Sequence, residues 1–221
     1  MELAICSFAS SSAGNSFLIQ SQNTRMLIDV GISAKKTEQS LAACGLSCAE
    51  LDGIVLTHEH VDHIKGIGTL LAKKSCHEPV FATRGTYEFA AEKYPQTAGK
   101  PFEIIRDGDR FRVGDITVEA FRISHDAAEP VGYTFQKGGR KIAFVTDTGC
   151  MTAEIFTAIR GADILVIEAN HEKNILLYGK YPYSVKHRIL SDRGHLSNEA
   201  TGAVLSSYLA DFDDGRRPEV L

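Results

Sequence analysis

The sequence Thr57-His58-Glu59-His60-Val61-Asp62-His63 carries three of the chain's eight histidines. It directly follows residues 53–56, an apolar run that is typical of a buried strand. The strand therefore ends in a dense cluster of imidazole and carboxylate groups. Such groups at a strand end are typical ligands of zinc, manganese or iron. We interpret the cluster as a metal centre, and the alternative is a solvated polar turn.

The spacing within this motif predicts two neighbouring metal sites. Alternate side chains of an extended segment point to the same side, so His58 and His60 can reach one ion together. Asp62 and His63 lie on the turn that enters the next helix, and they can face a second ion. A soluble protein has little other use for so many histidines in so short a stretch.

Outside the motif, the sequence alternates between short strands and helices. Residues 33–44 are a predicted helix with Ser33 as its N-cap. Residues 110–113 and 116–123 flank a Gly-Asp turn, and another pair flanks Gly138-Gly139, so two hairpins are expected. The pattern predicts an α/β (α+β) fold of two mixed sheets packed face to face and flanked by helices. The expected strands are residues 1–8, 16–20, 25–29, 53–56, 80–82, 102–105, 110–113, 116–123, 132–136, 141–146 and 163–168, and the expected helices are residues 33–44, 64–75, 83–94, 152–160 and 197–209.

Length and composition indicate a single domain, residues 1–221. This length suffices for one full core, and neither a repeat nor a linker divides the chain. The chain is 43% hydrophobic without any apolar run long enough for a membrane span. Its start lacks the charge and cleavage region of a signal peptide, so we expect a cytoplasmic protein. The net charge of -4 means that any nucleic-acid binding needs a local patch or the metals.

The motif resembles the HxHxDH signature of the metallo-β-lactamase superfamily. This resemblance implies a four-layer αββα sandwich with a two-metal centre along one rim. It implies that Asp147 bridges both ions, and that Asp29 braces the site without binding metal. Asp29 closes a predicted strand and Asp147 follows one, as a site along the rim of a sandwich requires. The metal ligands implied by the resemblance are His58, His60, Asp62, His63, His125 and Asp147.

Longer segments narrow the resemblance to the WalJ (YycJ) family of bacterial metallo-β-lactamase-fold proteins. This family is similar to exonucleases that degrade double-stranded DNA from 5' to 3', so the resemblance implies a metal-dependent phosphodiesterase acting on DNA. The match runs along essentially the whole chain. The segments are residues 7–19 (SFASSSAGNSFLI), 57–66 (THEHVDHIKG), 144–149 (FVTDTG), 165–172 (LVIEANHE) and 193–200 (RGHLSNEA).

The chain departs from the family pattern in two places. Residues 10–15, SSSAGN, lack one glycine that is usual in the family, and we expect this to alter only the loop. The family continues past a strand resembling residues 218–221 into a segment whose histidine completes the second metal site. This sequence ends before that segment. We therefore expect two divalent ions, zinc or manganese, with the second ion bound weakly or absent.

Cleavage of a phosphodiester also requires help with the leaving alkoxide, by a proton or an ion. Glu168 ends an apolar strand, and His195 precedes the helix that begins near Ser197. The pair resembles the Glu and His of the tRNA 3'-processing endonucleases of the same superfamily, to which proton donation is assigned. We expect Asp62, Glu168 and His195 to be the catalytic residues. A turn carboxylate is the alternative for Glu168, and a core histidine or a helix cap is the alternative for His195.

The segment between these two residues, 173–193, interleaves cations with tyrosines. Cations can contact phosphates and aromatic rings can stack on unpaired bases, so the segment predicts a nucleic-acid patch. A solvated helix face is the alternative. The predicted patch consists of Lys180, Lys186, Arg188, Arg193, Tyr181 and Tyr183.

Two other functions remain open from the sequence. The same metal chemistry attacks carbonyl carbons, so a hydrolase of lactams, lactones or thioesters is one alternative. Such an enzyme would need neither the basic aromatic segment nor the pair of Glu168 and His195. A metal-binding module without turnover is the other alternative. We expect DNA as the partner and no membrane association, and the sequence identifies no protein partner.

Overall fold

The N-terminal part of the chain forms a six-stranded mixed sheet in the computed structural model, which describes residues 3–210, 212 and 218–221. The first two strand pairs are antiparallel, and the following three are parallel. In their order across the sheet, the strands are β1 (Ala4–Ala9), β2 (Ser16–Gln20), β3 (Arg25–Ile28), β4 (Gly53–Val55), β5 (Val80–Thr83) and β6 (Phe102–Ile105).

The second sheet also has six strands, and it contains both predicted hairpins. The strands on either side of Gly114-Asp115 pair antiparallel, as do those on either side of Gly138-Gly139. The last two strand pairs of the chain are parallel, which makes this sheet mixed as well. Across the sheet, the order is β12 (Glu219–Val220), β11 (Ile164–Ile167), β10 (Arg140–Val145), β9 (Val131–Lys137), β8 (Ile116–Arg122) and β7 (Arg110–Val113).

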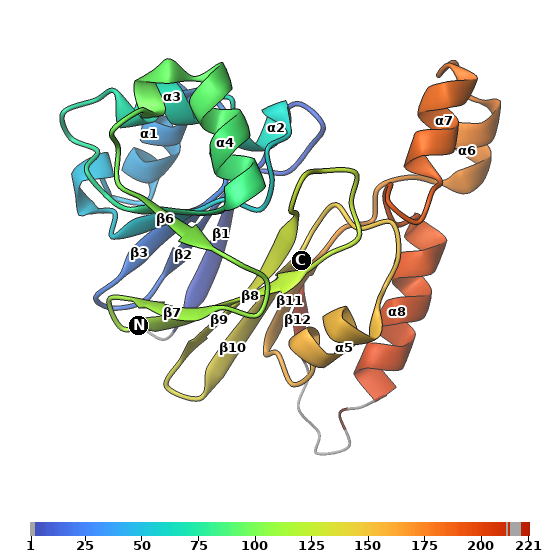
Figure 1. Cartoon of the computed structure of the whole chain (residues 1–221). Coiled ribbons are helices and arrows are strands. Elements are labelled where there is room, and N and C mark those ends of the chain that lie inside the picture. The colour runs from blue at the N-terminus through green and yellow to red at the C-terminus, as the bar shows by residue number, and fades with distance from the viewer. Residues whose placement is uncertain (1–2, 211, 213–217) are drawn as a thin grey trace.

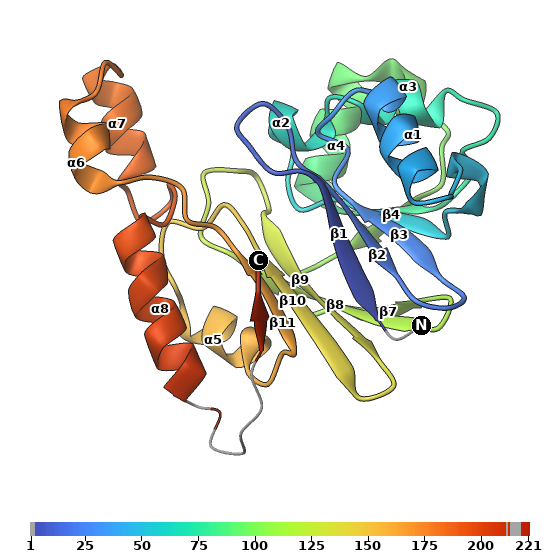
Figure 2. The ribbon, with the colours of Figure 1, turned by 180° about the vertical axis from the view of Figure 1, so that it is seen from behind.

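Helices lie outside both sheets, so the molecule has the predicted four layers (Figures 1 and 2). None of the helices in the described part of the chain is long and apolar enough to cross a membrane. The helices are α1 (Ala34–Ala43), α2 (Val61–Ile64), α3 (Ile67–Leu71), α4 (Arg84–Lys93), α5 (Ala153–Ile159), α6 (Lys173–Tyr178), α7 (Tyr183–Ile189) and α8 (Asn198–Ala210), with 3-10 turns η1 (Cys48–Glu50) and η2 (Pro95–Thr97).

Side chains point alternately to the two faces of each strand, and this alternation divides the core into layers. In β2, Phe17 and Ile19 join the cluster between the sheets, whereas Leu18 joins the cluster beneath α1 and α3. A third cluster fills the space between the second sheet and α5 and α8. Successive side chains of a strand point to opposite faces, so each sheet is buried on both faces. This double layer supports the loops at its rim.

Helix bounds near the motif differ from the prediction. The expected helix over residues 64–75 is confirmed only in part, because α2 already begins at Val61, a break follows, and α3 ends at Leu71. The break between the two helices lies at Gly66, where an added Cβ would come within 2.0 Å of Ile32 O. Gly66 therefore packs against the chain that leaves β3. The helix therefore begins within the histidine motif, at Val61, and not after it as the hydrophobic pattern indicates.

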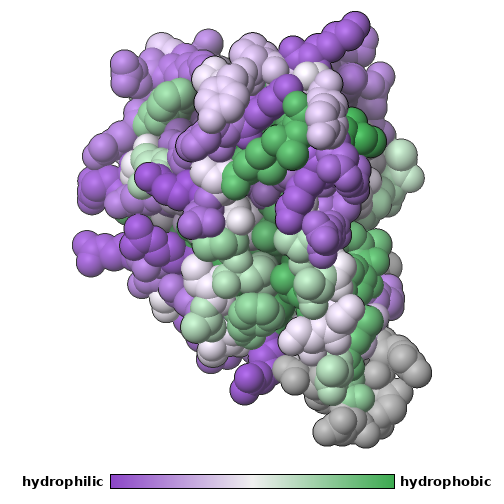
Figure 3. All heavy atoms as spheres, turned by 90° about the vertical axis from the view of Figure 1, so that its right-hand side faces the viewer, coloured by the Kyte–Doolittle hydropathy of each residue, from purple (hydrophilic) through white to green (hydrophobic). Residues whose placement is uncertain are grey.

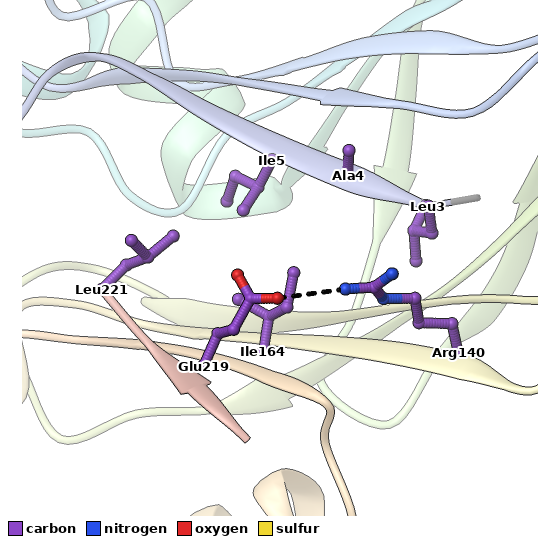
Figure 4. Close-up of a pocket in the computed structure, with 7 residues that line it drawn as sticks. All are labelled: Leu3, Ala4, Ile5, Arg140, Ile164, Glu219 and Leu221. Carbon is purple, nitrogen blue, oxygen red and sulfur yellow. Dashed lines mark hydrogen bonds and ion pairs between the residues drawn. The ribbon is translucent and has the colours of Figure 1, made fainter. Parts of the chain in front are cut away.

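A cavity of about 460 Å³ opens between the edge strands β1 and β12 (Figure 4). Leu3 and Ile5 line one side of it, and Ile164 lies on the other. Arg140 and Glu219 also line the cavity, with 3.4 Å between Arg140 Nη2 and Glu219 Oε1. Its lining contains none of the predicted site residues, so the candidate site lies elsewhere.

Candidate metal centre

The histidine motif leaves the end of β4, and its last residues form the first turn of α2. Asp62 and His63 lie in this turn. Two neighbouring loops hold the turn by backbone hydrogen bonds, because Asn15 N donates to Asp62 O at 2.7 Å and Val30 N donates to His63 O at 2.8 Å. Gly31 permits this approach, since a Cβ there would lie 1.6 Å from Asp62 O. The motif is therefore held by residues distant in sequence.

Three imidazole rings, those of His58, His60 and His125, lie close together beyond the end of β4. The ring centroids of His58, His60 and His125 lie 4.7 to 4.9 Å apart, and His125 Nε2 is 3.1 Å from His60 Nδ1. Burial lowers the pKa of His58 well below its usual value and lowers the pKa of His125 to about 4. Both rings are thus neutral at pH 7, which is the form that binds metals.

His58 offers the clearest sign of a cation site. The side chain is fully buried, and its Nε2 has no hydrogen-bond partner among the described residues. A buried nitrogen of this kind is costly unless something satisfies it. His58, His60 and His125 each offer one ring nitrogen, and these three nitrogens lie within 4.8 Å of one another. The three histidines therefore fit a divalent cation.

A second group of ligand atoms adjoins the first and consists of His58, His63 and Asp147. His63 Nε2 lies 2.8 Å from Asp147 Oδ2, and its Nδ1 lies 2.7 Å from Asp29 Oδ2. Burial lowers the pKa of His63, but these two carboxylates outweigh burial and raise that pKa well above its usual value. The Asp62 carboxylate is close by, with Oδ2 3.8 Å from His63 Nε2.

Two aspartates of the site share an unusual backbone conformation. Asp29 has φ 58° and Asp147 has φ 57°, and they are the non-glycine residues with positive φ in the described part of the chain. This left-handed conformation costs about 1 kcal/mol or more and is concentrated at functional sites. Thr57 N and Oγ1 donate to the Asp29 carboxylate, both at 2.8 Å. Both aspartates therefore combine an uncommon backbone conformation with a place in the candidate site.

Asp147 joins this group to Glu168 and His195. His195 Nδ1 lies 3.2 Å from Asp147 Oδ1 and 3.0 Å from Glu168 Oε2. Thr148 N donates to the other Glu168 oxygen at 2.6 Å. Burial raises the pKa of Glu168. Burial lowers the pKa of His195, but its hydrogen bonds to the two carboxylates outweigh burial and raise that pKa to about 10.

Comparison with known proteins agrees with this geometry. The profile of the beta-lactamase superfamily domain matches residues 24–210. Exodeoxyribonuclease YycJ of Bacillus anthracis is 38% identical over 211 residues, which cover 96% of this chain and 79% of that protein. The chain belongs to the YycJ/WalJ family of the β-lactamase superfamily. The predicted family membership is thus confirmed.

Other relatives support the same family and fold. Exodeoxyribonuclease WalJ of Streptococcus pneumoniae serotype 2 is 39% identical to this YycJ/WalJ-family chain over 193 residues, with 86% of this chain and 71% of that protein covered. Among solved structures, the short form of human tRNase Z superposes with a TM-score of 0.68 and 16% identity, covering 92% of this chain and 88% of that chain. At this identity the likeness concerns the fold alone, and it confirms the predicted sandwich.

The predicted nucleic-acid patch of this YycJ/WalJ-family chain lies on α7 and on the loops on either side of it, next to α6. These helices project beyond the second sheet, above α8 (Figures 1 and 2). Tyr181 and Tyr183 are 61% and 82% exposed, and Lys180 is exposed as well. Figure 3 faces this side of the molecule, where hydrophilic side chains surround hydrophobic patches. The exposed rings leave room for a stacked base.

The remaining cations of the patch contact the protein itself. Lys186 Nζ donates to Leu177 O at 2.6 Å, and Arg193 donates twice to His125 O, at 3.2 and 3.1 Å. Arg188 forms a two-pronged ion pair with Asp126. This hydrogen bonding with Asp126 raises the pKa of Arg188. The patch therefore contains exposed side chains, Lys186, which joins α7 to α6, and two arginines, which contact His125 and Asp126 at the site.

Sequence reasoning did not identify three residues that contact the site. Asn15 Nδ2 lies 3.0 Å from His63 Nε2, and Thr57 Oγ1 donates to Asp29. Asp126 directly follows His125, and its Oδ1 lies 3.5 Å from His125 Nε2. A polar residue next to a predicted ligand is a signal that could have drawn attention to Thr57 and Asp126.

Proposed function

We propose that this chain is a metal-dependent exodeoxyribonuclease that hydrolyses DNA phosphodiesters from a 5' end. The observation that carries the proposal is the convergence of His58, His60 and His125 beside His63 and Asp147. Two relatives that match most of the chain are named exodeoxyribonucleases. The 5'-to-3' direction and the action on duplex DNA are supported by the resemblance of the motifs. A cytoplasmic location fits a DNA substrate.

The cofactors proposed are two divalent cations, zinc or manganese. His58, His60 and His125 would hold one of them, and Asp62, His63 and Asp147 would hold the other. When bound, such a pair supplies an activated water near neutral pH and neutralises charge on the phosphodiester oxygens. Asp29 would hold the His63 ring in place without binding metal, because it already accepts hydrogen bonds from Thr57.

The proposed proton donor to the leaving alkoxide is His195. Its contacts with Glu168 and Asp147 are made through Nδ1, which leaves Nε2 to donate. A ring with a pKa of about 10 carries its proton at pH 7. Glu168 fixes the ring orientation, and its own position is set by the backbone N–H groups of Thr148 and Leu196. Donation from a positioned imidazolium accelerates such steps by about 10²- to 10⁴-fold.

The proposal is tested with duplex DNA labelled at either the 5' or the 3' end. The protein is treated with a chelator and then reloaded with Mn²⁺ or Zn²⁺. With metal present, we expect early release of the 5' label and gradual shortening of the 3'-labelled strand. We expect no cleavage while the chelator is present. Cleavage of a chromogenic lactam in place of DNA would contradict the proposal and support the small-molecule hydrolase. Metal binding without cleavage of either compound would support the module without turnover.

A further inference from the structure

Arg188 connects the projecting helix α7 to the rim of the candidate metal centre. Its Nη2 lies 3.0 Å from Asp126 Oδ1, and its Nε pairs with the other carboxylate oxygen. Asp126 Oδ1 in turn lies 3.5 Å from His125 Nε2 and 3.9 Å from His60 Nε2. A single carboxylate therefore separates the guanidinium from two of the proposed metal ligands.

Arg188 differs from the other patch cations that contact the protein. Lys186 and Arg193 donate to backbone carbonyls, Lys186 to Leu177 of α6 and Arg193 to His125. The Arg188 side chain is 51% exposed, whereas that of Asp126 is 30% exposed. Solvent, and hence a substrate, can therefore reach Arg188 while Asp126 holds it at the rim.

The pairing with Asp126 leaves part of the guanidinium available. Arginine has five N–H donors in a rigid planar fork, and Asp126 engages the edge formed by Nε and Nη2. The edge between the two terminal nitrogens can bind a second anion. Arginine forks bind phosphate as they bind carboxylate, through two parallel hydrogen bonds. An arginine in this position suits a phosphate just outside the metal centre.

We propose that Arg188 binds the DNA phosphate next to the scissile one, and that Asp126 is the residue that positions Arg188 for this contact. The inference rests on the proposed function. The scissile phosphate would lie against the histidine cluster. The Asp126 carboxylate lies between this cluster and Arg188, so the guanidinium lies just outside the metal centre. Arg188 therefore favours substrates that carry a second phosphate, that is a polynucleotide, over diesters with a single phosphate.

The test compares duplex DNA with bis(p-nitrophenyl) phosphate, a diester with one phosphate. Arg188→Ala is expected to raise KM for DNA about tenfold, as for a lost charge-assisted hydrogen bond, with kcat changed less than about twofold. KM for the small diester should stay unchanged. Arg188→Lys, which keeps the charge without the fork, should fall between wild type and Arg188→Ala. The control is Arg112→Ala on the edge strand β7, where the arginine is exposed.

Asp126 is tested in a double-mutant cycle with metal content measured in every variant. Asp126→Ala should raise KM for DNA in the wild-type background and change it no further in the Arg188→Ala background. Additive effects of the two substitutions would overturn the positioning role. An unchanged KM for DNA in Arg188→Ala, or an equal rise for both substrates, would overturn the phosphate contact while leaving the proposed function intact. A wild-type protein that cleaves the small diester but not DNA would overturn both.

Discussion

The Asp29 carboxylate lies 2.7 Å from Nδ1 of His63, on the side of the ring opposite to Asp147 Oδ2. In the neutral ring this contact keeps the proton on Nδ1 and leaves Nε2 for a cation. A second hydrogen bond of this kind fixes both the tautomer and the orientation of metal-binding histidines. Asp29 is itself fixed by Thr57 N and Oγ1. The buried chain Thr57–Asp29–His63 therefore determines where one proposed ligand points.

Asp29→Asn is expected to weaken metal binding by about 10- to 100-fold. Asparagine tolerates the left-handed backbone of residue 29, so the loop should keep its course. The amide places an N–H group where one of the two carboxylate oxygens accepts from Thr57 or His63, so one of these contacts is lost. Metal affinity is measured by competition with a chelator, and Asp107→Asn at an exposed position is the matched control. Equal affinities in the two variants would show that Asp29 does not brace the site.

Metal binding is expected to release a proton at pH 7 and to strengthen as the pH rises. Asp29 and Asp147 raise the pKa of His63 well above its usual value, so the ring is protonated before metal binds. It must lose that proton to become a ligand, so affinity gains about tenfold per pH unit for each proton released. His125, with a pKa of about 4, is already neutral. Calorimetry in two buffers of different ionisation enthalpy measures the release, and zero release would contradict a ligand role for His63.

Substitutions of Asp147 and of His195 are expected to have different effects on metal content and on kcat. Asp147→Asn should remove activity together with metal, since Asp147 belongs to the ligand group of His58 and His63. His195→Ala should lower kcat by about 10²- to 10⁴-fold with metal content unchanged, as for the loss of a proton donor. Metal analysis and kcat are measured on the same samples. Equal metal loss in both variants would show that His195 is a ligand or a structural support.

The parts of the site that could be predicted are those encoded by local spacing. His58, His60 and His63 fall in one short motif, so the strand-end geometry indicates their convergence without further information. His125 and Asp147 required the resemblance to a family, because nothing in the residues between them specifies which strand ends meet. Asp126 and Arg188 are 62 residues apart, and their pairing is formed only by the fold.

The fold was predictable where apolar periodicity was strong, and less so where short helices follow tight turns. Most strand positions were correct, since buried strands read as apolar runs between turn residues. Helices α6 and α7 were not predicted, because they are short and leave most of their side chains exposed. Tyr178 and Tyr183 are 89% and 82% exposed. Leu176 of α6 is the one buried side chain that the two helices contain, so they lack the periodic pattern on which sequence reasoning depends.

Gly149 brings three loops of the site together. Its N–H donates to Ser124 O at 2.8 Å, next to His125, and Ser124 Oγ donates to Asp192 O at 2.7 Å. A Cβ on Gly149 would lie 2.4 Å from Asp192 C, closer than real Cβ contacts allow. The loop that carries Asp147 can therefore lie this close to its neighbours because residue 149 has no side chain.

Gly149→Ala is therefore expected to lower the free energy of unfolding by about 1–3 kcal/mol, as overpacking does, and to weaken metal binding as well. Gly202→Ala is the matched control, because nothing lies within 4 Å of a Cβ at this exposed position of α8. That substitution should raise stability by up to about 1 kcal/mol, since alanine is the better helix former. Urea unfolding and metal titration of both variants check the pair. Equally strong metal binding in Gly149→Ala and Gly202→Ala would contradict this prediction. It would show that the close approach of Gly149 to Asp192 does not set the position of the metal ligands.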